Sequence, residues 1–116
     1  MPGLNGQKVT AVMVTWNSAG TLSGLLDSLL ADGAVSEIIA VDNASTDGTR
    51  ELIKEKYPAV RLIENPVNTG FAAGANSGIR LASGSLIFLV NPDISFAPGF
   101  IGSLSRALLE DGGTGA

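Results

Sequence analysis

The side chains that could do chemistry in this chain are carboxylates, amides and hydroxyls, because the sequence contains neither Cys nor His. Disulfides, thiolate metal sites and an imidazole base are therefore excluded. The remaining polar groups gather directly after apolar runs, in three places: Thr15, Trp16 and Asn17; Asp42 and Asn43; Asn91 and Asp93. Such groups suit hydrogen bonding to a polar ligand and coordination of a hard divalent cation.

The central polar group follows Ile38–Val41, an apolar run typical of a strand that is covered on both faces in a parallel sheet. Asp42 stands at the carboxyl end of this strand. Ser45 and Asp47 are N-cap residue types, and the pattern after them predicts a helix that ends at Pro58. Ligands of open α/β sheets bind just outside such strand ends. A structural alternative is that Asp42 only caps the turn and Asp47 only offsets the helix dipole.

The elements ahead of this stretch repeat the pattern. Residues 8–15 have the composition of a strand, and leucines recurring at i, i+3, i+4, i+7 and i+8 over 22–30 predict an amphipathic helix. Asn17 or Ser18 could cap that helix. For Trp16, the structural alternative is that an isolated aromatic side chain belongs to the core.

A third strand is predicted over 60–64, followed by a turn-rich loop and a helix. The apolar residues assigned to the buried face of this helix are Phe71, Ala72, Ala73, Ala75, Ile79, Leu81 and Ala82. Gly70, Gly74 and Gly78 recur every four residues and would let the helix approach its neighbour closely. Asn76 lies on the same helix, and its structural alternative is an ordinary exposed Asn.

A fourth, wholly apolar strand is predicted over 85–90, and it runs directly into Asn91-Pro92-Asp93. This tripeptide has the structural alternative of a plain turn. A last helix is expected to start at Pro98 and to carry apolar residues at Leu104, Leu108 and Leu109, before a flexible tail over 112–116.

Strand–helix units in series predict an α/β fold: a doubly wound, mostly parallel sheet with helices on both faces. All three polar groups would then lie at one edge of the sheet, where such folds place their ligand. The loop after the first strand has neither the G-x-G-x-x-G nor the G-x-x-x-x-G-K-[ST] spacing, which argues against dinucleotide and P-loop sites.

Length and charge limit the remaining classes. The 116 residues suggest one domain over 1–116, with enough chain for one core. No apolar run has the length of a membrane span, and residues 1–7 do not resemble a signal peptide. A net charge of -4 argues against a nucleic-acid partner.

With these motifs in view, the chain resembles the family 2 glycosyltransferases with the GT-A (nucleotide-diphospho-sugar transferase, Rossmann-like) fold. Four ordered segments carry the resemblance: TWNS at 15–18, VDNASTDGT at 41–49, NTGFAAGAN at 68–76 and NPD at 91–93. The resemblance covers nearly the whole chain but only the N-terminal, donor-binding half of such enzymes. Subgroups with Asn-Pro-Asp resemble rhamnosyltransferases and related enzymes of cell-envelope polysaccharide synthesis.

The resemblance implies a role for each matching residue. The base and ribose would be bordered by Thr15, Trp16 and Asn17. Asp42 would accept a hydrogen bond from the imide N–H of the base. The pocket would be shaped by Asn43, Ser45 and Asp47. The donor would also be lined by Asn68, Gly70, Phe71 and Asn76.

By the same resemblance, Asn91 and Asp93 occupy the place of the Asp-x-Asp motif, whose second member binds the divalent cation. Asp93 would hold Mg²⁺ or Mn²⁺, which stabilises the negative charge of a leaving diphosphate. Asn91 departs from the commoner motif because it is a neutral amide. The donor would be a dTDP- or UDP-sugar, and the partner a glycan or lipid-linked acceptor.

Inverting transfer also needs a general base, and the family carries it beyond the Asn-Pro-Asp motif. Glu110 and Asp111 are the carboxylates that follow Asp93, and neither is a good candidate, so no catalytic residue is identified. The chain is expected to be a truncated piece that lacks the acceptor half. Self-association as a homo-oligomer is also expected, because apolar surface would be left uncovered. The chain is expected to be cytoplasmic, and the full-length protein would lie at the inner face of the membrane. The alternatives are a non-catalytic nucleotide-sugar-binding module and a purely structural α/β domain.

Overall fold

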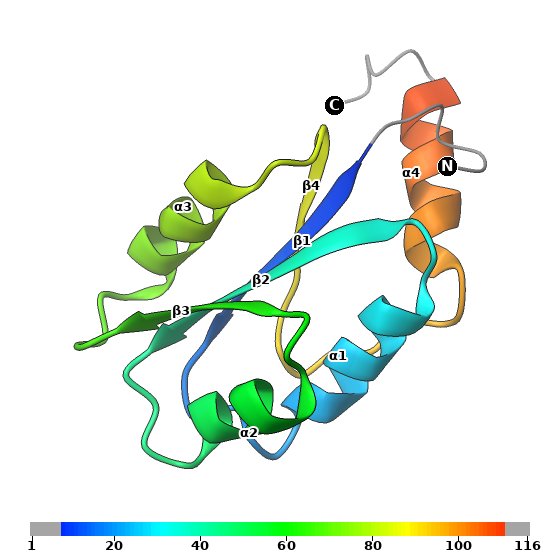
Figure 1. Ribbon diagram of the computed structural model, residues 1–116. Helices are drawn as coiled ribbons and strands as arrows, with labels where there is room; N and C mark the ends of the chain where they lie inside the picture. The colour runs from blue at the N-terminus through cyan, green and yellow to red at the C-terminus, as the bar shows by residue number, and fades with distance from the viewer. Residues whose placement is uncertain (1–7, 111–116) are drawn as a thin grey trace.

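A computed structural model describes residues 8–110 of the chain. Its elements follow one another as β1 (Val9–Thr15), α1 (Leu22–Ala31), β2 (Val35–Asn43), α2 (Thr49–Lys56), β3 (Arg61–Asn65), α3 (Phe71–Leu81), β4 (Leu86–Leu89) and α4 (Phe100–Glu110). Strands and helices alternate throughout (Figure 1). The predicted alternation is therefore confirmed. The tail predicted over 112–116 lies outside the described residues.

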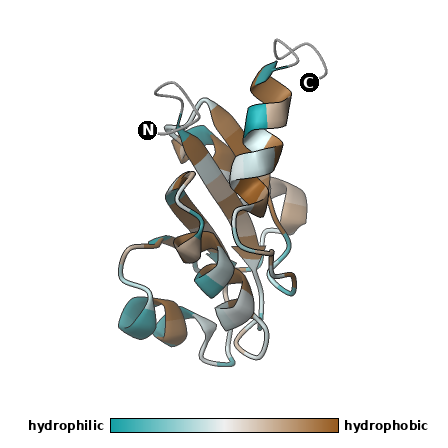
Figure 2. Cartoon of the chain, turned by 90° about the vertical axis from the view of Figure 1, so that its right-hand side faces the viewer, coloured by the Kyte–Doolittle hydropathy of each residue, from teal (hydrophilic) through white to brown (hydrophobic). Residues whose placement is uncertain are grey.

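The four strands form one parallel sheet in the order β3-β2-β1-β4. Every residue of β1 is buried, and β2 is buried from Ile38 to Asn43, as expected for central strands covered on both sides. β4 lies at an edge, and its burial alternates: Ile87 and Leu89 are 40% and 44% exposed. In Figure 2 the strands at the centre of the molecule are mostly hydrophobic along their length.

Helices cover both faces of the sheet, which confirms the doubly wound class. On one face, α1, α2 and α4 enclose the larger core, whose fully buried members include Leu25, Leu26, Met13, Ile53 and Ile101. On the other face, α3 packs over β1 and β2 near a small cluster of Val12, Ile39 and Val41. Among residues 8–110, no helix combines the length and apolar character needed to cross a membrane.

Glycines form the contact face of α3. Gly74 and Gly78 are buried against the sheet, with Gly74 over Val14 and Gly78 over Val12. The predicted close approach is confirmed. The predicted apolar face is largely wrong, because the larger apolar residues Phe71, Ile79 and Leu81 are 54%, 38% and 40% exposed. The backbone approaches so closely that only glycine and alanine fit between the helix and the sheet, and the bulky side chains turn outward.

Other local predictions also need correction. Leu30 belongs to the leucine pattern that predicts the apolar face of α1, but it is 48% exposed. Neither Asn17 nor Ser18 caps α1 with its side chain; Thr21 holds the N-cap position. Trp16 is 57% exposed, so the alternative of a core tryptophan is wrong.

The start of α4 is tied to the rest of the fold by Asp32. Its carboxylate accepts hydrogen bonds from the backbone N–H groups of Ile101 (2.9 Å) and Gly102 (3.3 Å), and from that of Ala34 (3.0 Å). Asp32 is buried, and a carboxylate satisfies the free N–H groups at a helix start. The helix begins at Phe100, two residues after the predicted Pro98.

Candidate functional site

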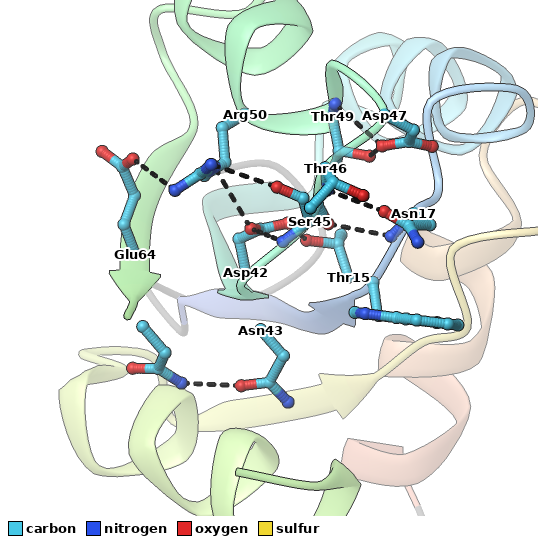
Figure 3. Close-up of polar contacts among 12 residues, drawn as sticks. Thr15, Asn17, Asp42, Asn43, Ser45, Thr46, Asp47, Thr49, Arg50 and Glu64 are labelled. Atoms are coloured by element: carbon cyan, nitrogen blue, oxygen red, sulfur yellow. Dashed lines mark hydrogen bonds and ion pairs between the residues drawn. The ribbon is translucent and has the colours of Figure 1, made fainter. Parts of the chain in front are cut away.

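Thr15 and Asp42 are register partners at the carboxyl ends of β1 and β2. The Thr15 Oγ1 atom donates a hydrogen bond of 2.7 Å to Asp42 Oδ1, and both residues are fully buried (Figure 3). The expected meeting of these two polar groups at one sheet edge is therefore confirmed. It follows from the parallel register, which brings the ends of the two strands level.

Ser45 supplies two further hydrogen bonds to Asp42. The Ser45 Oγ donates to Oδ1 (2.6 Å) and the Ser45 backbone N–H donates to Oδ2 (2.9 Å). Between them, Ala44 takes a left-handed φ of 62°, a conformation that costs a non-glycine residue free energy and that clusters at functional sites. Asp42 thus holds its turn together, and the structural role raised from the sequence is present.

The loop after β1 and the loop after β2 are joined by direct hydrogen bonds. The backbone N–H of Asn17 donates to Ser45 Oγ (2.8 Å), and the Asn17 Oδ1 accepts from the Thr46 backbone N–H (2.8 Å). The Ser18 backbone N–H donates to Thr49 Oγ1 (2.9 Å). We call these two segments, 16–19 and 44–49, the paired loops.

Asp47 completes the paired loops. Its Oδ2 accepts from the Ala19 backbone N–H (3.1 Å), and its Oδ1 accepts from the N–H and hydroxyl of Thr49 at the start of α2. The Thr49 hydroxyl, and then these backbone donors, hold the pKa of Asp47 below its usual value. Asp47 is exposed and stays ionised, as suits the start of a helix.

Arg50 and Glu64 belong to this cluster but were missed in the sequence. The Arg50 Nε lies 3.7 Å from Asp42 Oδ2, and its Nη2 donates to the Ser45 carbonyl oxygen (3.0 Å). Its Nη1 lies 3.7 Å from Glu64 Oε1, while Lys54 Nζ is 3.0 Å from Glu64 Oε2. The signal in the sequence that could have pointed to Arg50 is the position of Asp42 at the end of a strand covered on both faces, because a carboxylate there needs a compensating cation or several hydrogen-bond donors.

Asn43 organises a second polar cluster, on the α3 side. Its Nδ2 donates to the Gly70 carbonyl oxygen (3.0 Å), and its Oδ1 accepts from Asn65 Nδ2 (2.8 Å) and Thr69 Oγ1 (3.2 Å). Asn68 Oδ1 accepts from the Gly70 N–H (2.8 Å). Gly70 has a φ of 88°, which is why glycine stands before α3.

Asn91 and Asp93 lie beyond β4, at the same sheet edge. The Val90 N–H donates to the Val12 carbonyl oxygen (2.9 Å), which continues the pairing of β4 with β1 up to this point. Asn91 and Asp93 follow in a turn in which the Ile94 N–H donates to the Asn91 carbonyl oxygen (3.3 Å), and both are exposed.

The structure therefore sorts the predicted site residues into three sets. Thr15, Asn17, Asp42, Ser45 and Asp47 form one hydrogen-bonded network; Asn43, Asn68 and Gly70 form another; Trp16, Phe71, Asn76, Asn91 and Asp93 are exposed. Within residues 8–110, no group of three or more Asp and Glu residues could hold a metal ion by itself. Glu110 is exposed at the end of α4, and Asp111 lies outside the described residues.

Comparison with protein families gives one matching model, described as glycosyl transferase family 2, over residues 10–116. The chain is 32% identical over 108 residues to an N-acetylglucosaminyl-diphospho-decaprenol L-rhamnosyltransferase of Mycobacterium tuberculosis, covering 83% of this chain and 35% of the relative. It is 37% identical over 93 residues to a poly(ribitol-phosphate) beta-glucosyltransferase of Bacillus spizizenii, covering 74% of this chain and 15% of the relative.

Two solved structures are similar in fold. The mannosyltransferase PcManGT from Pyrobaculum calidifontis, in complex with GDP-Man and Mn²⁺, superposes with a TM-score of 0.76 at 27% identity, over 88% of this chain and 31% of that one. S. aureus TarS 1-349 in complex with UDP superposes with a TM-score of 0.78 at 21% identity, over 90% and 32%. The chain thus spans about a third or less of the length of the proteins it matches.

Proposed function

The chain belongs to glycosyl transferase family 2, and from this premise we propose that it binds the nucleoside-diphosphate-sugar donor of a glycosyl transfer at the carboxyl edge of its sheet. The observation that carries the proposal is the linked set of polar groups after β1 and β2, Thr15 to Asp42 to Ser45, beside the exposed turn of Asn91 and Asp93. These are the strand ends at which open α/β sheets bind ligands.

The base is assigned to the Asp42 side of this edge. An imide N–H, as in uracil or thymine, can donate to a carboxylate, whereas the corresponding ring nitrogen of cytosine has no hydrogen. A dTDP- or UDP-sugar is therefore the proposed donor. Since Asp42 is fully buried, the base reaches it only when the loop from Ala44 to Asp47 shifts. The exposed indole of Trp16 and the Asn17 side chain border the base and ribose.

The diphosphate is assigned to the neighbouring turn, with Asn43, Ser45 and Asp47 shaping the pocket and the segment Asn68–Asn76 lining the donor. Asp93 fits a divalent cation as a single protein ligand, because its exposed carboxylate offers hard oxygen atoms. The diphosphate would supply further oxygen ligands. Mg²⁺ or Mn²⁺ bound there would stabilise the charge on the leaving diphosphate.

The rest of the reaction is also a proposal. Transfer with inversion to a glycan or lipid-linked acceptor would need a general base and an acceptor site that we assign to sequence beyond this chain. A non-catalytic nucleotide-sugar-binding module is the second candidate: within residues 8–110, Glu110 is the only carboxylate after Asp93, and it is exposed at the end of α4. The exposed Ile87 and Leu89 on the edge strand support association with further protein, including a second copy.

Isothermal titration calorimetry with UDP, dTDP, GDP and CDP, each with and without Mn²⁺, tests the proposal. We expect UDP or dTDP to bind more tightly than CDP, and Asp42→Asn to remove this preference. The lost charge-assisted hydrogen bond corresponds to about 1.5 to 3 kcal/mol. Equal affinity for UDP, dTDP and CDP would remove Asp42 from base recognition. Absence of binding by all four nucleotides would overturn the donor-binding proposal.

A further inference from the structure

Arg50 contacts three parts of the fold that meet next to the paired loops (Figure 3). From α2, its guanidinium reaches Asp42 at the end of β2, the Ser45 carbonyl in the loop, and Glu64 in β3. Its side chain is 32% exposed and that of Glu64 is 38% exposed, so the ion pair is partly open to solvent. The arrangement places one cation between two carboxylates.

Asp42 has one acceptor position left. A carboxylate accepts about four hydrogen bonds. Thr15 Oγ1 and Ser45 Oγ take two on Oδ1, and the Ser45 N–H takes one on Oδ2. The open position is therefore on Oδ2, the oxygen that the Arg50 Nε approaches to 3.7 Å. That separation is too long for a hydrogen bond.

The facing donor is also unused. Within residues 8–110 the buried Nε of Arg50 has no hydrogen-bond acceptor. An unsatisfied buried N–H is unfavourable, so closure onto Asp42 would be favourable for the pair alone. The other two nitrogens have partners elsewhere. Nη2 donates to the Ser45 carbonyl oxygen (3.0 Å), and Nη1 lies 3.7 Å from Glu64 Oε1, while the other oxygen of Glu64 pairs with Lys54 Nζ at 3.0 Å.

We propose that Arg50 is a positioning residue whose distance from Asp42 is set by Glu64, and that this distance controls how readily Asp42 accepts the imide N–H of a uracil- or thymine-type base. The inference rests on the proposed function. When the loop at Ser45 shifts to admit a base, Asp42 loses the two hydrogen bonds from Ser45 and Arg50 loses the Ser45 carbonyl. Glu64 then becomes the partner that keeps the guanidinium off the freed positions on Oδ2. Arg50 acts through Asp42 and does not touch the ligand.

Glu64→Gln tests the inference, because glutamine removes the charge that restrains Arg50. We expect the affinity for UDP to fall about two- to fivefold, the range that a half-exposed ion pair can supply. The affinity for CDP should not change, since cytosine cannot use the open position on Asp42. Glu55→Gln, an exposed glutamate on α2, is the matched control and should alter neither affinity. Glu64→Asp keeps the charge and should lie closer to wild type.

A double-mutant cycle separates a positioning role from a general structural one. In the Arg50→Gln background, Glu64→Gln should have no further effect on the ratio of UDP to CDP affinity. The inference would be overturned if Glu64→Gln lowered the UDP and CDP affinities together. It would also be overturned if Glu64→Gln changed the affinity ratio equally in the wild-type and Arg50→Gln backgrounds. Either result would leave nucleotide binding itself in place. A wild-type chain that binds neither nucleotide would overturn the proposed function instead, and the inference with it.

Discussion

Gly78 of α3 stands so close to Val12 of β1 that a Cβ atom at position 78 would lie 2.5 Å from the Val12 Cγ1 atom. Gly78→Ala should therefore lower the free energy of unfolding by about 1 to 3 kcal/mol, the usual cost of overpacking. Gly24→Ala is the matched control in α1, where the nearest atom would be Ser95 Cβ at an ordinary 3.8 Å. That variant should gain about 0.5 to 1 kcal/mol from helix propensity. Urea unfolding of both variants checks the opposite signs.

Ala44 has its φ at 62°, between Asp42 and Ser45. Ala44→Gly should raise the free energy of unfolding by about 0.5 to 1 kcal/mol, because the relief of a left-handed alanine exceeds the entropy that glycine adds to the unfolded chain. Ala59→Gly, in an exposed turn without positive φ, should instead lose stability. Thermal unfolding that shows a loss for both variants would argue against strain at Ala44.

Glu37, at the end of the sheet opposite the carboxyl edge, should make the stability of the fold depend on pH. The Ser83 backbone N–H, and then the hydroxyls of Thr10 and Ser83, hold the pKa of Glu37 below its usual value despite partial burial. A lowered folded-state pKa contributes stability that is present above the unfolded pKa and lost as pH falls through the folded value. Wild type should thus lose more stability between about pH 5 and pH 3 than Glu37→Gln does. Urea unfolding at each pH measures this, with Glu55→Gln as the control. Curves of unfolding free energy against pH that run parallel for wild type and Glu37→Gln would contradict the prediction.

Substitutions at Asp93 and Asn91 test the assignment of a divalent cation to Asp93. If Asp93 is the protein carboxylate on the ion, Asp93→Ala should abolish the effect of Mn²⁺ on UDP affinity. Asn91→Asp should enlarge that effect, because it adds a second negative oxygen ligand. Calorimetry with and without Mn²⁺ measures both. If the turn after β4 has only a structural role, both variants would change stability and leave UDP affinity equally dependent on Mn²⁺.

The strand ends could be predicted from the sequence because they depend on local patterns. The continuous apolar run before Asp42 indicated a central strand, and parallel topology then brought Thr15 and Asp42 together. Helix faces were harder. Helical periodicity alone places Leu30 and Phe71 on the apolar faces of their helices, yet both are exposed in the structure. Which side of a helix is buried depends also on how closely the neighbouring element approaches.

Arg50 could not be assigned from its position, since it looks like an ordinary polar residue of a short helix. Its role depends on Glu64, which lies fourteen positions along the chain and comes near only when β3 pairs with β2. The burial of Asp42 was likewise unexpected for a residue assigned to ligand contact. It results from Ser45, which folds back over the carboxylate through the turn at Ala44.

The most direct test of donor binding at the carboxyl edge is an NMR titration of the ¹⁵N-labelled chain with UDP and Mg²⁺. The chain has a single tryptophan, so its indole N–H gives one assignable signal at Trp16. We predict saturable shifts for that signal and for the amides of Asn17, Thr46 and Gly70, with the amides of Glu37 and Ser83 at the opposite edge unmoved. Shifts confined to Glu37 and Ser83, or none at any of these positions up to millimolar UDP, would contradict the account.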